Sequence, residues 1–130
     1  MKDCTSEIKR AKRTIELIFG IFAALFIAAL IVGLVYRSQH SFSRSKWKEK
    51  PDARTEIVDD LLAEHALVGM QETDILELLG SHDNDYGYFV ENDRFVYCLG
   101  PERGLFRIDR EWLIIDFADG IVVDYAITTD

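Results

Sequence analysis

Hydrophobic and polar positions divide the chain into a long apolar run, a polar segment and a region of short periodic patterns. The run from Leu17 to Tyr36 contains 20 residues and no charged side chain. A helix rises about 1.5 Å per residue, so such a run spans about 30 Å, the thickness of the hydrocarbon core of a bilayer. We therefore predict a transmembrane helix over residues 15–37. A basic tail over residues 1–14 precedes it, and a polar basic linker over residues 38–51 follows it.

A cleaved signal peptide is the alternative role for this run. The apolar part of a signal peptide usually has about 7–15 residues and ends at a small-x-small cleavage site. The run here is longer, and its end from Ile31 to Tyr36 lacks a convincing site of that kind. We therefore predict an uncleaved anchor in the lipid bilayer. Phe42 and Trp47 of the linker are then expected at the membrane interface, unless a helix continues through them.

Helical periodicity predicts two helices at the start of the region 52–130. The first is expected over residues 53–66, and its apolar positions are Ile57, Val58, Leu61 and Leu62. The second is expected over residues 72–79, and its apolar positions are Ile75, Leu78 and Leu79. Gly80 stops this second helix, while Gln71 and Asp74 occupy its N-cap and N3 positions.

The pattern after residue 85 changes to strands. Aromatic and β-branched residues predict strands over residues 86–90 and 94–99, and a hairpin over residues 111–117 and 121–128. Residues 118–120 form the expected turn of that hairpin. The chain is therefore predicted to be α+β. One N-terminal transmembrane helix precedes two helices packed on a three- or four-stranded antiparallel meander sheet over residues 52–130.

The register of the hairpin depends on the length of its turn. A two-residue turn places Ile115 opposite Asp124, so a carboxylate joins the apolar face. A three-residue turn places Phe117 opposite Ile121 and Ile115 opposite Val123, and it keeps Asp116 and Asp124 off that face. A one-residue slip moves every side chain to the other face. We therefore predict the three-residue turn.

This register leaves apolar side chains on the opposite face, with Trp112, Ile114 and Val122 among them. The loop over residues 100–110 is expected to cover them, unless they form a surface for a partner or for self-association. The same loop holds Arg103, Arg107 and Arg110, which either pair internally or make a binding loop. The predicted partner-binding residues are Trp112, Ile114, Val122, Arg103, Leu105, Phe106 and Arg107.

Charge is distributed unevenly. The formal net charge is −8. Residues 1–50 hold ten Lys/Arg and four Asp/Glu, which is +6, and residues 51–130 hold five Arg and nineteen Asp/Glu, which is −14. The acidic region argues against binding to nucleic acid, which needs a basic surface. Four basic residues lie within eight positions before the apolar run, so the positive-inside rule favours a cytoplasmic N-terminus and an extracytoplasmic domain.

The sequence offers little sign of catalysis. Cys4 and Cys98 lie on opposite sides of the predicted span, so they cannot pair within one chain. The acidic loop around His82, Asp83 and Asp85 is the alternative site for a ligand, a metal or an enzyme, but it fails the calcium-loop template. Asp116 and Asp124 are expected to be solvated charges. We predict no catalytic residue, no cofactor and no metal site.

Two segments resemble a known family. The first segment, residues 69–80, runs from Gly69-Met70 to Leu78-Leu79-Gly80, and the second, residues 112–123, contains the hairpin turn Phe117-Ala-Asp-Gly-Ile121. Both are similar to motifs of the BamE (SmpA/OmlA) family, related in fold to β-lactamase-inhibitor-like proteins, and the similarity covers roughly residues 54–128. The resemblance implies two helices on a three-stranded antiparallel sheet in an envelope protein that binds other proteins. Gln71 replaces the usual Thr, and the anchor is an apolar helix instead of a lipid-modified Cys.

Together these features predict a non-catalytic protein-interaction module of the cell envelope. It is expected in the plasma (inner) membrane as a single-pass protein with its C-terminal domain outside. The predicted partners are the bilayer, through residues 15–37, and another envelope protein or a second copy of the chain.

Overall fold

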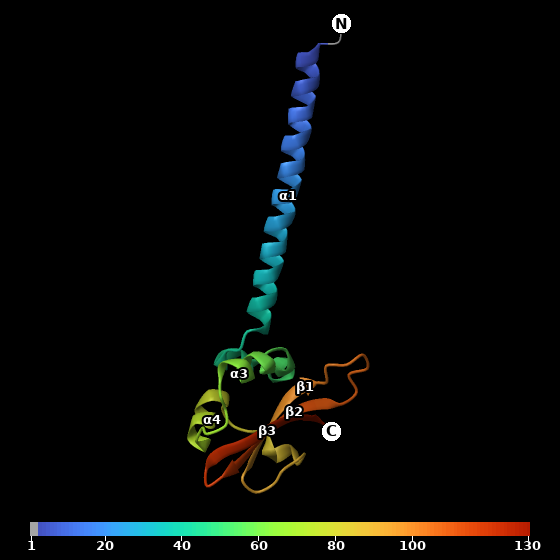
Figure 1. Ribbon diagram of the computed structural model, residues 1–130. Coiled ribbons are helices and arrows are strands. Elements are labelled where there is room, and N and C mark those ends of the chain that lie inside the picture. Colours follow the sequence, from blue (N-terminus) through green and yellow to red (C-terminus); the bar gives the residue numbers. More distant parts are fainter. Residues whose placement is uncertain (1–2) are drawn as a thin grey trace. The chain divides into compact units, whose positions relative to one another are not determined.

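The computed structural model describes residues 3–130, apart from the side chain of Tyr86 (Figure 1). Lys2 and the start of the predicted basic tail lie outside this range. The chain divides into two compact units, Met1–Ser38 and Gln39–Asp130.

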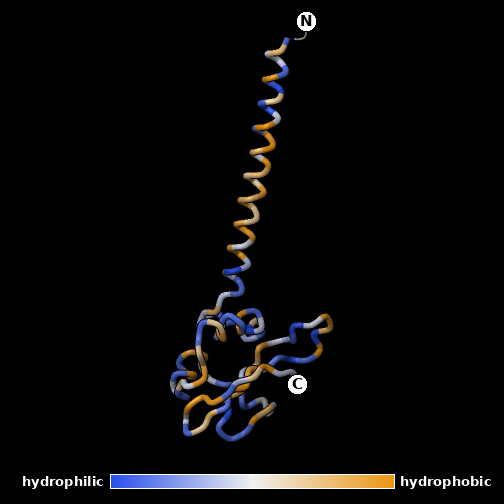
Figure 2. Tube along the Cα trace, in the orientation of Figure 1, coloured by the Kyte–Doolittle hydropathy of each residue, from blue (hydrophilic) through white to orange (hydrophobic). Residues whose placement is uncertain are grey.

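The first unit consists of most of one long helix, α1, which runs over Cys4–His40 and has 37 residues. Large apolar side chains between Ile8 and Tyr36 are 46–73% exposed, and none of the helix's residues is buried. Figure 2 shows the apolar stretch as a continuous band between polar ends. The helix is long and apolar enough to cross a membrane. The predicted helix over residues 15–37 therefore lies inside a longer one.

The second unit is an α+β domain with a three-stranded antiparallel sheet. Its helical elements are α2 (Arg44–Glu49), the 3-10 helix η1 (Pro51–Glu56), α3 (Val58–Glu64), α4 (Glu72–Leu79) and the 3-10 helix η2 (Asn84–Tyr86). Its strands are β1 (Arg94–Pro101), β2 (Arg110–Ala118) and β3 (Ile121–Thr129), in the spatial order β1-β2-β3. The α+β class and the three-stranded meander agree with the prediction.

The predicted linker is a folded part of this unit. Ser43 caps α2, because its hydroxyl accepts a hydrogen bond from the Lys46 amide at 3.2 Å. Trp47 is fully buried, and its ring lies 6.0 Å from that of Tyr97 in β1. Phe42 is half-buried against the same core. The expectation of Trp47 at a membrane interface is therefore wrong.

Two other predicted elements differ from the structure. The first helix of the predicted domain is divided into η1 and α3, and it ends at Glu64 instead of residue 66. Residues 86–90 do not form a strand, because Gly87 and Phe89 take left-handed backbone angles (φ 77° and 53°) that interrupt an extended run. The second predicted helix is α4 with its expected ends, and the Asp74 carboxylate accepts a hydrogen bond from the Gln71 amide at 3.2 Å.

The core lies between the helices and one face of the sheet. Trp47, Val58, Leu61 and Ile75 contribute from the helices. Tyr97 and Leu99 of β1 and Leu113, Ile115 and Phe117 of β2 contribute from the sheet. The apolar periodicity of these helices and strands is thus the pattern that forms the core.

The hairpin register follows the two-residue alternative at the turn and departs from both alternatives beyond a bulge. Asp119 and Gly120 have positive φ (51° and 75°), as a two-residue turn of type I′ requires, and Phe117 lies opposite Val122. A bulge between Asp116 and Phe117 then shifts the pairing, so that Ile115 lies opposite Tyr125. The predicted three-residue turn is therefore wrong. Val122 is buried at 1% exposure and Val123 is 52% exposed, because the bulge inserts one residue at that point.

Candidate functional site

The loop between β1 and β2 is the most apolar exposed feature of the second unit. Leu105 is 98% exposed, and Phe106 and Ile108 are each 81% exposed. In Figure 1 this loop extends away from the sheet beyond the ends of β1 and β2. The sequence analysis predicted Leu105 and Phe106 as partner-binding residues and did not include the equally exposed Ile108. The signal was present, because three large apolar residues occur within four positions between charged Arg103 and Asp109.

The base of this loop is held by a backbone hydrogen bond and by ion pairs. The Glu102 amide donates to the Asp109 carbonyl at 2.9 Å. Arg103 donates to the Glu111 carboxylate at 3.0 Å and to Asp59 at 2.6 Å. Glu111 is buried, at 7% exposure. Its hydrogen bond with Arg103 is the main reason that the pKa of Arg103 is raised. Arg103 therefore fixes the base of the loop instead of offering a free charge.

The other two arginines of the loop differ from each other. Arg110 donates to the Cys98 sulfur at 3.1 Å and pairs with Asp52. Arg107 is exposed and makes no ion pair within residues 3–130. The loop thus carries three exposed apolar side chains and one unpaired cation at its tip. Its base is fixed by ion pairs.

The second predicted surface is buried. Trp112 is 2% exposed, Ile114 is 8% exposed, and Val122 faces the core. The ring of Tyr88 lies 5.3 Å from the ring of Trp112. The segment that follows η2 therefore contributes to the cover, a role the prediction gave to residues 100–110. These three residues do not offer the free apolar face that the sequence suggested.

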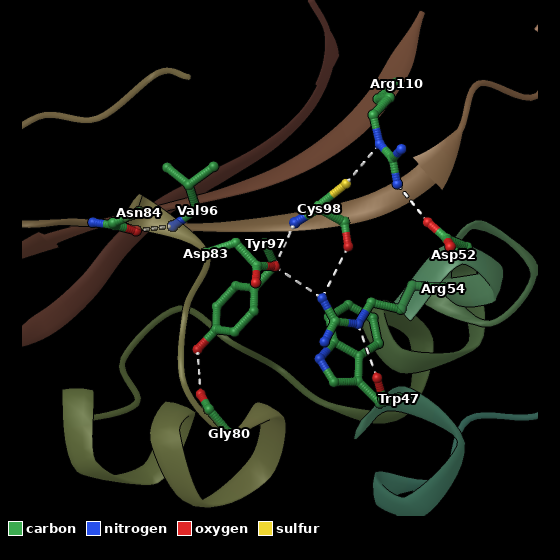
Figure 3. A network of polar contacts seen from close by, with 10 residues as sticks. All are labelled: Trp47, Asp52, Arg54, Gly80, Asp83, Asn84, Val96, Tyr97, Cys98 and Arg110. Atoms are coloured by element: carbon green, nitrogen blue, oxygen red, sulfur yellow. Dashed lines mark hydrogen bonds and ion pairs between the residues drawn. The ribbon is translucent and has the colours of Figure 1, made fainter. Parts of the chain in front are cut away.

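The acidic loop around His82–Asp85 supports the outer edge of β1 (Figure 3). The Asp83 carboxylate accepts from the Cys98 amide at 2.9 Å and from Arg54 at 3.0 Å. The Asn84 side chain accepts from the Val96 amide at 2.9 Å. These contacts satisfy strand-edge groups that would otherwise be free to pair with another chain. Asp83 is thus engaged in the fold and is not a free ligand for a metal.

Arg54 is the centre of this network. Its side chain is 8% exposed and donates to the carbonyls of Trp47 and Cys98, each at 2.9 Å. Its guanidinium also lies 4.9 Å from the centre of the Trp47 ring. A buried charge is tolerated only where it is paired and hydrogen-bonded, and Asp83 with the two carbonyls supplies these partners. Sequence reasoning missed this residue, since a single Arg in an acidic helical segment has no distinctive pattern.

A cleft of about 500 Å³ lies beside this network. It is bordered by η1, by the segment around η2 and by the adjacent ends of β1 and β2. Its lining residues are Pro51, Asp52, Arg54, Asp83, Tyr88, Cys98, Arg110 and Trp112. Burial raises the pKa of the neighbouring Tyr97, whose hydroxyl donates to the Gly80 carbonyl at 2.9 Å. The sequence had singled out three residues of this lining: Trp112 as a partner-binding residue, Arg110 as part of a possible binding loop, and Asp83 as part of the alternative ligand loop.

Neither a metal centre nor a free pair of carboxylates is present in the described part of the chain. Within the described part of the chain, no group of three or more His, Cys, Asp and Glu side chains is arranged to hold a metal ion. Asp116 lies opposite Asp124, but it accepts from Arg94 at 2.6 Å. This contact raises the pKa of Arg94 and neutralises one member of the carboxylate pair.

Comparison with protein-family models, with curated proteins and with solved structures found no match to this chain.

Proposed function

We propose that this chain is a membrane-anchored, non-catalytic module that binds another protein through the apolar loop between β1 and β2. The observation that carries the proposal is the exposure of Leu105, Phe106 and Ile108, at 81–98%. Burial of each such side chain by a partner contributes about 1.5–3 kcal/mol. The fixed base lowers the ordering cost of binding, because Arg103 already holds the loop to Glu111 and Asp59.

The proposed anchor is α1 in the plasma (inner) membrane. The length and apolar surface of α1 support this role, and the proposed orientation places the N-terminus in the cytoplasm by the basic residues before the apolar run. The domain would then face the extracytoplasmic side. A signal sequence is the alternative for the same helix.

A distant relation to BamE-like proteins remains part of the proposal. Its support is the order of α4, the Leu78-Leu79-Gly80 end and the hairpin around Asp119-Gly120. These are helix-end and turn residues, so they concern fold and leave activity open. The proposed partner is another envelope protein, because the acidic domain of one copy would repel that of a second copy.

Photo-crosslinking in membranes tests the loop. A photoreactive phenylalanine analogue replaces Phe106 in the full chain, and we expect a protein adduct whose yield falls about tenfold when Leu105 and Ile108 are changed to Ser. The matched control changes Val68 and Val123 to Ser, since both are exposed apolar residues outside the loop, at 55% and 52%. An adduct that survives the Leu105 and Ile108 changes, or adducts to lipid alone, would contradict the proposal.

A further inference from the structure

The cleft beside Arg54 has the size and the lining of a site for a small ligand. Its volume of about 500 Å³ falls within the range of ordinary ligand pockets, about 300–1,000 Å³. Tyr88, Trp112 and Pro51 supply apolar wall, and Arg110, Cys98 and the acidic residues supply polar atoms. One wall is fixed in place, because η1 meets β1 closely at Gly100 and Arg54 bonds to the Cys98 carbonyl.

Residues that line this cleft carry hydrogen-bond donors with unused capacity. A guanidinium carries five N–H donors, and the side chain of Arg110 contacts only the Cys98 sulfur and Asp52 within residues 3–130. The buried indole Nε1 of Trp112 has no hydrogen-bond partner among the described residues. The Asp83 carboxylate is held through Oδ2 by Arg54 and the Cys98 amide. The cleft therefore fits a ligand that offers acceptor atoms.

The ion pair between Arg110 and Asp52 can exchange its carboxylate. The two side chains are 47% and 76% exposed, and exposed pairs of this kind contribute little to stability. A ligand carboxylate can therefore replace Asp52 at the same guanidinium with little loss. Arg also binds carboxylates in a two-point geometry, which favours a charged acceptor over a neutral carbonyl.

We propose that this cleft binds a carboxylate attached to an apolar group. The carboxylate pairs with Arg110, and the apolar group packs against Tyr88 and Trp112. A small organic acid and the C-terminal residue of a protein both carry this chemistry. The site is separate from the exposed tip of the loop, so its failure leaves the proposed protein-binding function untouched.

Titration of the full chain in detergent micelles tests the proposal by nuclear magnetic resonance. The probes are 3-phenylpropionate and the peptide Gly-Gly-Phe with a free C-terminus, and their controls are the corresponding amides. We expect saturable shifts of the Trp112 indole N–H signal with the acids, and binding about tenfold weaker with the amides. The signal of buried Trp47 serves as an internal reporter that the fold is intact.

Two variants identify the residues responsible. Arg110→Gln should weaken binding of the acids at least about tenfold, whereas Arg107→Gln, an exposed arginine outside the lining, should leave it unchanged. A Cys4→Ser background provides a second readout, because bound acid should slow maleimide labelling of Cys98. If Arg110→Gln loses the Trp47 signal, the fold itself has failed. Arg110→Lys, which keeps the positive charge but loses the two-point geometry, then replaces it and should also weaken binding of the acids.

The pattern of binding decides the outcome. Tighter binding of the peptide supports a protein C-terminus, and tighter binding of phenylpropionate supports a small acid. The proposal is overturned if neither acid shifts the Trp112 signal, if acids and amides bind equally, or if Arg107→Gln weakens binding as much as the Arg110 variants do.

Discussion

Gly100 determines how closely η1 can approach the sheet. Its φ of 112° lies in a region that side chains other than Gly rarely adopt, and a Cβ there would lie 2.3 Å from the Asp52 carbonyl oxygen. The contact is made with backbone, which cannot rotate away as a side chain can. Gly100 also lies at the bulge where β1 shifts its pairing with β2. One small residue thus positions Asp52 and Arg54 beside the cleft.

Substitution of this glycine should be costly. We expect Gly100→Ala to lower the free energy of unfolding by about 2–4 kcal/mol, because backbone strain and overpacking add together. Gly104→Ala is the matched control: a Cβ there meets the flexible Glu102 carboxylate at 3.3 Å, and its φ is unstrained. Denaturant unfolding of the full chain in micelles measures both. Equal stability of the two variants would contradict the close approach at Gly100.

At the scale of elements, the β2–β3 hairpin shows how a bulge decides which side chains face the core. The two-residue turn alone would place Asp124 opposite Ile115, on the apolar face. The bulge takes up one extra residue, so Val122, Tyr125 and Ile127 all face the helices. The edge of β3 is also paired near the turn, where the Gly69 amide donates to the Val122 carbonyl at 2.8 Å.

Neighbouring valines therefore provide a test of the register. Val122→Ala should destabilise the domain by about 1–3 kcal/mol, because it removes buried methyl groups from a packed core. Val123→Ala should change stability by less than about 0.5 kcal/mol, as expected at an exposed site. Thermal and denaturant unfolding of the two variants measure the difference. The reverse order of effects would instead support the three-residue turn.

At the scale of the whole molecule, the folded domain begins before the predicted boundary at residue 52. The compact unit includes α2, and Trp47 lies within its core. The Phe42 amide also donates to the Asp60 carboxylate at 2.6 Å. The segment that follows the apolar helix is therefore part of the domain.

Two fragments test this boundary. A fragment of residues 39–130 should unfold cooperatively, whereas residues 52–130 should lose about 3–5 kcal/mol or fail to fold, since Trp47 leaves a cavity in the core. A total stability of about 5–15 kcal/mol is typical of domains, so this loss is large. Circular dichroism melts of both fragments provide the measurement. Similar melting temperatures would show that α2 is dispensable.

Local pattern in the sequence was sufficient for several features of this protein. The long apolar helix, α4 with both its ends, the β strands of the meander and the α+β class all follow from periodicity over a few consecutive residues. Leu105 and Phe106 were also recognisable as candidate binding residues. The periodicity of a helix or strand and the glycine that ends it involve only residues close together in the chain. A single sequence is therefore enough to recognise them.

Tertiary structure alone decided the remaining features. Trp47 belongs to the core because its ring packs against Tyr97 of β1. Trp112 is covered because Tyr88, in the segment after η2, packs against it. Arg54 acquires its partners from α2, β1 and the loop before η2. Each of these results depends on contacts between residues far apart in the chain. The periodicity of neighbouring residues carries no information about such contacts. The sequence by itself thus determined which segments form helices and strands, and long-range packing decided which side chains are buried and which stay exposed.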